Sequence, residues 1–183
     1  MDNKEIFNDL KFDLQSICFS ANERLLKEEQ VRSSIFSSLR KQGYFVAAER
    51  NYSKNSEIEC DLVFWKDGEN ESWMEIKTSH YSELKDERIF DKNNKVSWNN
   101  KPGEQFKKWK EDIVKLESLG SDILKFFVLV EQCNEESCWD KILSEKKLEN
   151  FQLFQKLEQE SCEFELNWKK APVDKCVIRI FKI

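Results

Sequence analysis

The stretch ESWMEIKTSH, residues 71–80, decides the fold. Its apolar residues predict a strand in the protein core, yet Glu75 and Lys77 stand among them. Side chains of a strand alternate between its two faces, so residues 75 and 77 share one face while Met74 and Ile76 share the other. Burying a carboxylate and an ammonium costs free energy unless a mutual salt bridge or a chemical function offsets it. Both explanations are open at this point.

A second strand precedes this one, in EIECDLVFW, residues 57–65, and the turn at 66–70 predicts an antiparallel hairpin. The alternation rule then places Asp61 on the same side as Glu75 and Lys77. The other face of the strand is expected to carry Ile58, Cys60, Leu62 and Phe64. Two carboxylates held close in a partly dry site either keep a proton or bind a cation, and all-oxygen ligands favour Mg²⁺ or Mn²⁺.

Periodicity assigns the rest of the chain. Apolar residues spaced by three and four predict helices over residues 4–18, from a Ser20–Glu23 capping box to Gly43, over 103–119 and over 138–159. Strands are predicted over residues 44–50, 57–65, 72–78, 124–131, 162–168 and 176–183. A polar loop is expected over residues 79–102. The order ααβββαβα, followed by two strands, predicts one mixed α/β domain.

The second predicted helix carries an acidic residue on its apolar side. At about 100° per residue, Glu28 falls among Val31, Ile35 and Leu39, whereas Glu29 lies at the margin of that arc. A carboxylate is a poor choice for packing alone, so we expect Glu28 to reach the acidic cluster of the hairpin.

Composition limits the class of protein. The 183 residues are 39% hydrophobic and 36% charged, with a net charge of −5. This balance is typical of a globular domain, and a nucleic-acid function would need a local basic face or metal ions. Six cysteines show no Cys-x-x-Cys spacing, which argues against a zinc site. No apolar run approaches the length of a membrane span, so we expect a reduced, cytoplasmic protein.

The combined pattern resembles the PD-(D/E)xK nuclease superfamily, which has a restriction-endonuclease-like fold. The positions that match its motif are Glu28, Asp61, Glu75 and Lys77. The resemblance covers about residues 22–131 and implies a single domain over 1–183. In it, an αβββαβ core is extended by an N-terminal helix and by a C-terminal helix with two strands. Cys60 stands where the superfamily's name has proline.

The resemblance also implies roles for individual residues. The implied ligands of Mg²⁺ or Mn²⁺ are Asp61, Glu75, the carbonyl of Ile76, and Glu28, the last directly or through water. Lys77 would polarise the attacking water or stabilise developing negative charge. Glu49 and Glu59 are alternatives to Glu28, because both lie near the same face or strand edge.

The loop and the third predicted helix hold the densest basic run of the chain. Candidates for contact with nucleic acid are Gln105, Lys101, Lys107, Lys108 and Trp98. The alternative for the lysines is a solvated helix face, because acidic residues are interspersed. Trp98 alternatively packs over the core, and His80 is expected to be a loop residue.

These features predict a Mg²⁺-dependent endonuclease or exonuclease that hydrolyses phosphodiester bonds, in DNA, with a homodimer or a protein partner as its possible assembly. The alternative is a catalytically inactive protein of the same fold. It would be a regulatory subunit or inhibitor in a nucleic-acid or defence complex, with its buried charges serving as a structural ion-pair network.

Overall fold

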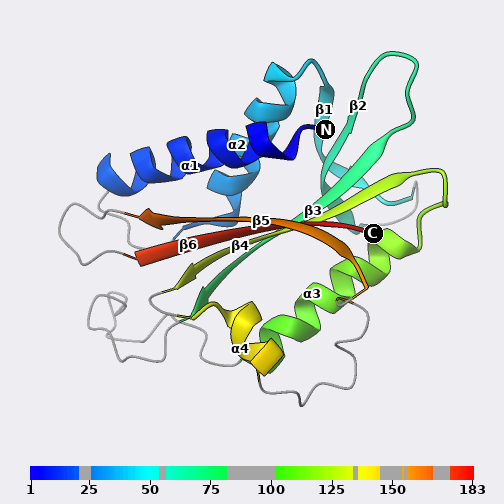
Figure 1. Ribbon diagram of the computed structural model, residues 1–183. Coiled ribbons are helices and arrows are strands. Elements are labelled where there is room, and N and C mark those ends of the chain that lie inside the picture. The colour runs from blue at the N-terminus through cyan, green and yellow to red at the C-terminus, as the bar shows by residue number, and fades with distance from the viewer. Residues whose placement is uncertain are drawn as a thin grey trace.

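The computed structural model describes residues 1–20, 26–53, 57–81, 102–133, 136–144, 154, 156–166 and 174–183. Within these residues a single six-stranded sheet carries two helices on each face (Figure 1). The helices are α1 (Asn3–Ser20), α2 (Glu28–Lys41), α3 (Pro102–Glu117) and α4 (Cys138–Ser144). The strands are β1 (Phe45–Asn51), β2 (Glu59–Trp65), β3 (Ser72–Tyr81), β4 (Leu124–Cys133), β5 (Glu158–Leu166) and β6 (Asp174–Lys182). No helix in this described part of the chain is long and apolar enough to cross a membrane.

The sheet has the order β1-β2-β3-β4-β6-β5. Strands β3 and β4 are parallel, and every other neighbouring pair is antiparallel. The predicted α/β class, the mixed sheet and the order of elements along the chain are therefore confirmed. The hairpin of β2 and β3 is confirmed as well, with Gly68 of its turn at φ 77°.

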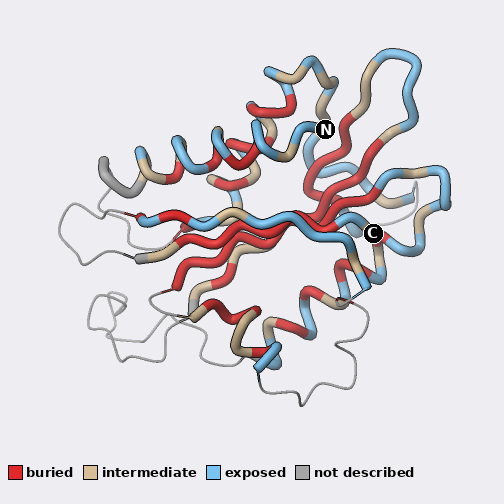
Figure 2. The backbone as a smooth tube through the Cα atoms, in the orientation of Figure 1, coloured by how far each residue is buried: buried red, intermediate tan, exposed pale blue. Residues whose placement is uncertain are grey.

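Each face of the sheet builds its own core. Met74 and Ile76 of β3 pack toward α1 and α2, whereas Trp73 packs toward α3 and α4. Figure 2 shows the central strands buried almost throughout, while α1 and α3 alternate between buried and exposed residues. This pattern follows from strand alternation and from the amphipathic spacing of the helices.

The second helix differs from its prediction at its start. Ser20 is the last residue of α1, and α2 begins at Glu28, where the Gln30 side chain accepts a hydrogen bond from the Lys27 N–H at 2.9 Å. The predicted Ser20–Glu23 capping box is thus wrong, because the helical periodicity of α1 continues through Ser20. The end was predicted correctly, since Gly43 at φ 82° follows the last turn in the left-handed conformation that glycine favours.

Two other boundaries differ. Strand β3 continues through Tyr81 and α3 begins at Pro102, so residues 79–81 and 102 of the expected loop over 79–102 belong to regular elements. Residues 82–101 lie outside the described residues. The helix expected over 138–159 overlaps β5, whose first residue, Glu158, pairs with Lys182 of β6. The start of that prediction is right, because α4 begins at Cys138, whereas at its end the pairing of β5 with β6 overrides the local helical spacing.

A buried polar cluster attaches α4 to the sheet. Arg179 of β6 contacts the carboxylate of Glu131 of β4, and its other nitrogen lies 3.0 Å from the Asp140 carboxylate. Glu131 is fully buried and also accepts the Trp139 N–H at 3.0 Å. The Ser137 hydroxyl accepts the Asp140 N–H at the start of α4. Each charge in this cluster therefore has a charged partner, as buried charges require.

Candidate active site

Strands β2 and β3 pair over only part of their length. Their register joins Leu62–Phe64 with Ser72–Met74, and in the described residues no pair follows beyond Met74. The Cys60 thiol lies where the strands separate and donates to the Met74 carbonyl at 3.1 Å. From Glu75 onward, one edge of β3 therefore needs hydrogen-bond partners other than a neighbouring strand.

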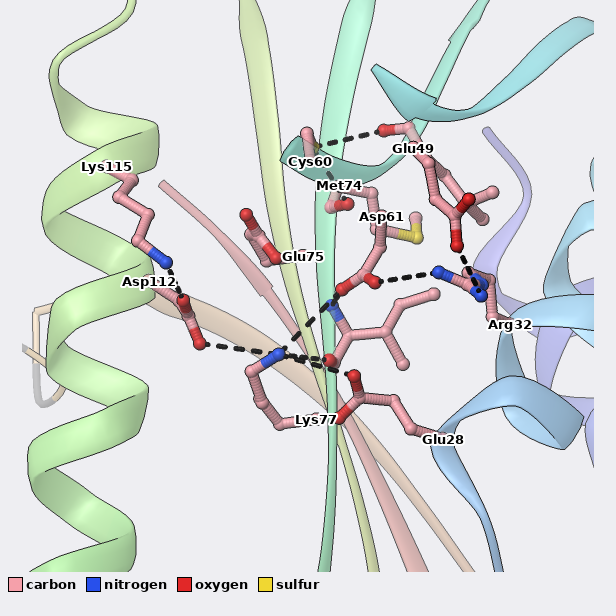
Figure 3. A network of polar contacts seen from close by, with 12 residues as sticks. Glu28, Arg32, Glu49, Cys60, Asp61, Met74, Glu75, Lys77, Asp112 and Lys115 are labelled. Carbon is pink, nitrogen blue, oxygen red and sulfur yellow. Dashed lines mark hydrogen bonds and ion pairs between the residues drawn. The ribbon is translucent and has the colours of Figure 1, made fainter. Parts of the chain in front are cut away.

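Side chains from α2, β2 and β3 itself supply those partners. The Ile76 N–H donates to Asp61 Oδ2 at 2.8 Å, and the Ile76 carbonyl accepts from Lys77 Nζ at 3.1 Å. The Thr78 backbone donates to the Glu28 carboxylate. The predicted residues Glu28, Asp61 and Lys77 thus meet at one point, which Figure 3 shows between α2 and α3.

The strand alternation that led to this expectation holds for Asp61 but not for its neighbour. Cys60 was expected to share a face with Leu62, yet it packs in the opposite core, with Val63. The strand is released from β3 at Leu62, and Glu49, across from Asp61 on β1, has a positive φ of 54°. Both features allow β2 to twist locally, as strands do at irregular pairings.

The Lys77 ammonium lies among carboxylates. Its Nζ is 3.4 Å from Glu28, 3.6 Å from Asp112 and 4.0 Å from Asp61. Burial alone would lower the pKa of Lys77, but the charges of Asp112, Asp61, Glu28 and Glu75 outweigh it, and the pKa is raised. Lys77 is therefore a stable cation near neutral pH rather than a proton acceptor.

Glu75 is the most deeply buried acid of the predicted set, with 3% of its surface exposed. Tyr52 donates its hydroxyl to Glu75 Oε1 at 2.6 Å. Burial, aided by repulsion from Asp61 and Asp112, outweighs this hydrogen bond and raises the pKa of Glu75 to about 8. At neutral pH the Glu75 carboxyl therefore retains its proton unless a positive charge approaches it.

The segment before α2 fixes the position of Glu28. The Leu26 N–H donates to Gln132 Oε1 at 3.1 Å, and the Leu26 carbonyl lies 2.8 Å from His80 Nε2. His80 lies in β3, so its prediction as a loop residue is wrong. Burial lowers the pKa of His80, so the ring is neutral and donates from Nε2 to the Leu26 carbonyl. Glu28 is the first residue of α2, not a member of its buried stripe, and burial raises its pKa against the opposing charge of Lys77.

Among the three candidates for the outer carboxylate, the structure places Glu28 at the site. Glu49 is instead paired with Arg32 of α2 at 2.9 Å and is mostly exposed. Glu59 is exposed at the first position of β2, across from Asn51. Arg32 also lies 3.5 Å from Asp61, so a guanidinium borders the acidic group on the α2 side.

Three residues of the site were missed from sequence: Asp112, Tyr52 and Arg32. Asp112 could have been found by the helical projection that selected Glu28, because it falls about 60° from Trp109 and about 40° from Leu116 on the buried side of α3. Tyr52 and Arg32 carry no comparable signal. A tyrosine after a strand and an arginine on an amphipathic helix are both ordinary features.

The predicted nucleic-acid contacts separate into groups. Lys101 and Trp98 lie outside the described residues. Of the predicted contacts, Gln105 and Lys108 follow one stripe of α3 with Asp112, and Lys115 lies on the same stripe, because residues three, four and seven apart share a helix side. Lys107 is exposed about 140° away from Asp112 around the helix. Only part of the predicted basic set therefore borders the acidic group.

The donor atoms fit a hard divalent cation. Carboxylates and a backbone carbonyl, partly buried, are the ligands that Mg²⁺ and Mn²⁺ prefer. Across the described residues, no three His, Cys, Asp or Glu side chains already converge as a metal site does. Asp61 is instead bonded to the Ile76 N–H, Glu75 to Tyr52, and Glu28 to Lys77. Binding a cation would require these carboxylates to exchange partners.

The raised pKa of Glu75 predicts an unusual pH dependence of stability. Its pKa is about 8 in the folded protein against 4.5 in the unfolded chain, so its stabilising effect is complete below pH 4.5 and is lost as the pH rises through 8. Thermal unfolding in EDTA should show the free energy of unfolding falling over this window, by at most about 1.4 kcal/mol per pH unit. Glu75→Gln should remove this component, and the exposed Glu57→Gln should not.

Added Mg²⁺ should reverse that loss. At pH 8 an excess of MgCl₂ is expected to raise the Tm of the wild type more than that of Glu75→Gln, because the cation stabilises the ionised carboxylate in the folded state. If the free energy of unfolding in EDTA changed equally with pH for the wild type and for Glu75→Gln, Glu75 would have an ordinary pKa and the prediction would be wrong.

Comparison with known proteins adds no relative. No protein-family model, curated protein or solved structure matches the chain. The resemblance to the PD-(D/E)xK superfamily therefore depends on the motif positions and their spatial arrangement alone.

Proposed function

We propose that this protein is a metal-dependent nuclease that hydrolyses phosphodiester bonds in DNA. The observation that supports it most is the edge of β3 beyond its pairing with β2. There Asp61 and Lys77 bond to the backbone of Ile76, and Glu28 contacts Lys77. Concentrating buried charge in this way costs folding free energy, and such a cost is typical of sites kept for function.

The carboxylates would hold the metal. Asp61, Glu75 and the Ile76 carbonyl would be the ligands, with Glu28 joining from the α2 side. A bound divalent cation polarises the phosphodiester and lowers the pKa of an attacking water molecule. The burial of Glu75 keeps bulk water away from one side of the group, and charge interactions there are stronger than in water.

Lys77 would act as a fixed positive charge. Its raised pKa keeps it protonated, so it is suited to donate hydrogen bonds to phosphate oxygens that gain negative charge in the transition state. The family resemblance implies two roles for Lys77, polarising the attacking water or stabilising developing negative charge, and the second is the one that a protonated Lys77 suits best.

The substrate would approach along α3. Gln105, Lys108 and Lys115 follow the side of the helix that carries Asp112, and the two lysines offset the acidic site locally in a chain of net charge −5. Cleavage of both strands of a duplex would further require two sites, so we include a homodimer in the proposal.

Incubation of supercoiled plasmid, linear duplex, single-stranded DNA and RNA with the purified protein tests the proposal. Cleavage of DNA in Mg²⁺ or Mn²⁺, absent in EDTA, is the expected result. Asp61→Asn should lower the rate at least about 100-fold, since it removes one charged ligand. Glu59→Gln is the matched control, an exposed acid on the same strand, and should cleave as the wild type does.

The alternative is an inactive protein of this fold whose charges form a structural ion-pair network. The several ion pairs of Lys77 favour it. Absence of cleavage on all four substrates, together with a Tm that neither Mg²⁺ nor Mn²⁺ changes, would support this alternative and reject the nuclease.

A further inference from the structure

Asp112 belongs to the site spatially but not to the set of expected metal ligands. It lies on α3, across Lys77 from α2 (Figure 3), and its side chain is 6% exposed. Its two oxygens contact different lysines: Oδ2 is 3.6 Å from Lys77 Nζ, and Oδ1 is 2.6 Å from Lys115 Nζ. Asp112 is thus a buried acid on the apolar side of α3 that lies between two ammonium groups, and this placement indicates a role in orienting a lysine.

The other polar contacts of Lys77 explain what that role is. Three of its acceptors, the Glu28 carboxylate, the Asp61 carboxylate and the Ile76 carbonyl, are the oxygens expected to bind the metal. A divalent cation and an ammonium repel each other and compete for the same lone pairs. Lys77 would therefore have to give up these oxygens when a cation binds, and among its contacts in the described residues the Asp112 carboxylate is the acceptor that remains.

We propose that Asp112 is a positioning residue that takes up the Lys77 ammonium when a divalent cation occupies the oxygens of Glu28, Asp61 and Ile76. The inference depends on the metal site of the proposed function and adds a residue that the family motif does not contain. Asp112 acts through Lys77 and does not itself bind the metal.

Lys115 makes this arrangement stable. It lies one helical turn after Asp112 and holds Oδ1, so the carboxylate keeps its orientation while Oδ2 stays directed at Lys77. Because each oxygen serves one lysine, Lys77 can move closer to Asp112 without displacing Lys115.

The test is a double-mutant cycle on Mn²⁺ affinity, measured by the paramagnetic resonance signal of free Mn²⁺. Asp112→Asn should weaken binding roughly 10-fold, because Lys77 then stays on the metal oxygens. In the Lys77→Met background, where no ammonium needs a new partner, Asp112→Asn should change the affinity by less than about twofold. Glu111→Gln, an exposed acid one position earlier on α3, is the control for simple loss of charge.

Other outcomes would overturn the inference. Equal weakening by Asp112→Asn in both backgrounds would make Asp112 a direct ligand or a general charge, and no weakening in either would leave it a packing residue. Should Asp112→Asn fail to fold, Asp112→Glu in the same cycle replaces it, with a smaller coupling of the same sign expected. Mn²⁺ binding with the expected coupling but without cleavage would reject the nuclease and keep the inference. No Mn²⁺ binding by any of the proteins would reject both.

Discussion

Replacing Lys77 with methionine is expected to lower the rate of phosphodiester cleavage about 10²–10³-fold, the effect of removing one charged donor from a transition state. Methionine keeps the length and apolar part of the side chain, so the change isolates the ammonium. Measurement of kcat under saturating Mg²⁺ and DNA tests this loss, with Lys11→Met, an exposed lysine of α1, as the control.

The same variant should also reveal what the ammonium does without metal. In EDTA, Lys77→Met leaves Glu28, Asp61 and Asp112 without the cation that they share, which should lower the free energy of unfolding by about 2 kcal/mol after allowance for partial exposure. Mn²⁺ should restore most of that stability, because it neutralises the same group of carboxylates.

A purely structural lysine would behave differently. If Lys77 were purely structural, the Lys77→Met protein would be destabilised in EDTA and would stay destabilised when Mn²⁺ is added. Unchanged cleavage by Lys77→Met would contradict the role of the ammonium in the reaction, whatever the effect on stability.

Arg179→Met is expected to lower the free energy of unfolding by about 3–5 kcal/mol, the largest stability effect that we anticipate for a single substitution in the described residues. The reason is that Glu131, fully buried, would lose its guanidinium partner and retain only neutral donors. Burial raises the pKa of Glu131 to about 7 despite Arg179, so the comparison belongs at pH 8, where the wild-type carboxylate is ionised. Loss of the guanidinium raises this pKa further, and protonation of Glu131 then limits the loss of stability.

Denaturant unfolding of a matched set measures this effect. The double variant Glu131→Leu with Arg179→Met should recover most of the loss, because an apolar pair leaves no unpaired charge. Lys175, on the same strand as Arg179, lies 3.3 Å from the more exposed Glu163 of β5, and Lys175→Met should cost less than about 1 kcal/mol. A loss for Arg179→Met as small as that for Lys175→Met would show that the Arg179 cluster does not hold α4.

The outline of the fold could be read from the sequence because its signals are local. The alternation in residues 71–80, the turn before it and Gly43 after α2 each depend on neighbouring residues alone, and all three predictions agree with the structure. The predictions that failed, the start of α2 and the end of the helix after Cys138, concern boundaries where two signals compete.

The candidate site was accessible from sequence to the extent that it follows one hairpin. Strand parity brought Asp61 to the side of Glu75 and Lys77, since those residues are joined by a short turn. Glu28 was selected from a helical projection that assumed an earlier helix start, and its place at Lys77 comes instead from Leu26, which His80 and Gln132 hold.

By itself, then, the sequence determined the mixed α/β class, the order of its elements and the hairpin that brings an acid beside a lysine. Only the tertiary structure decided that β2 separates from β3 on the N-terminal side of Leu62. It also decided that Asp112, Tyr52 and Arg32 contact Lys77, Glu75 and Asp61, respectively, beside the edge of β3 that this separation exposes. The physical reason is that alternation and turn chemistry act between near neighbours. The meeting of α2 and α3 at one strand edge depends instead on how both faces of the sheet are packed.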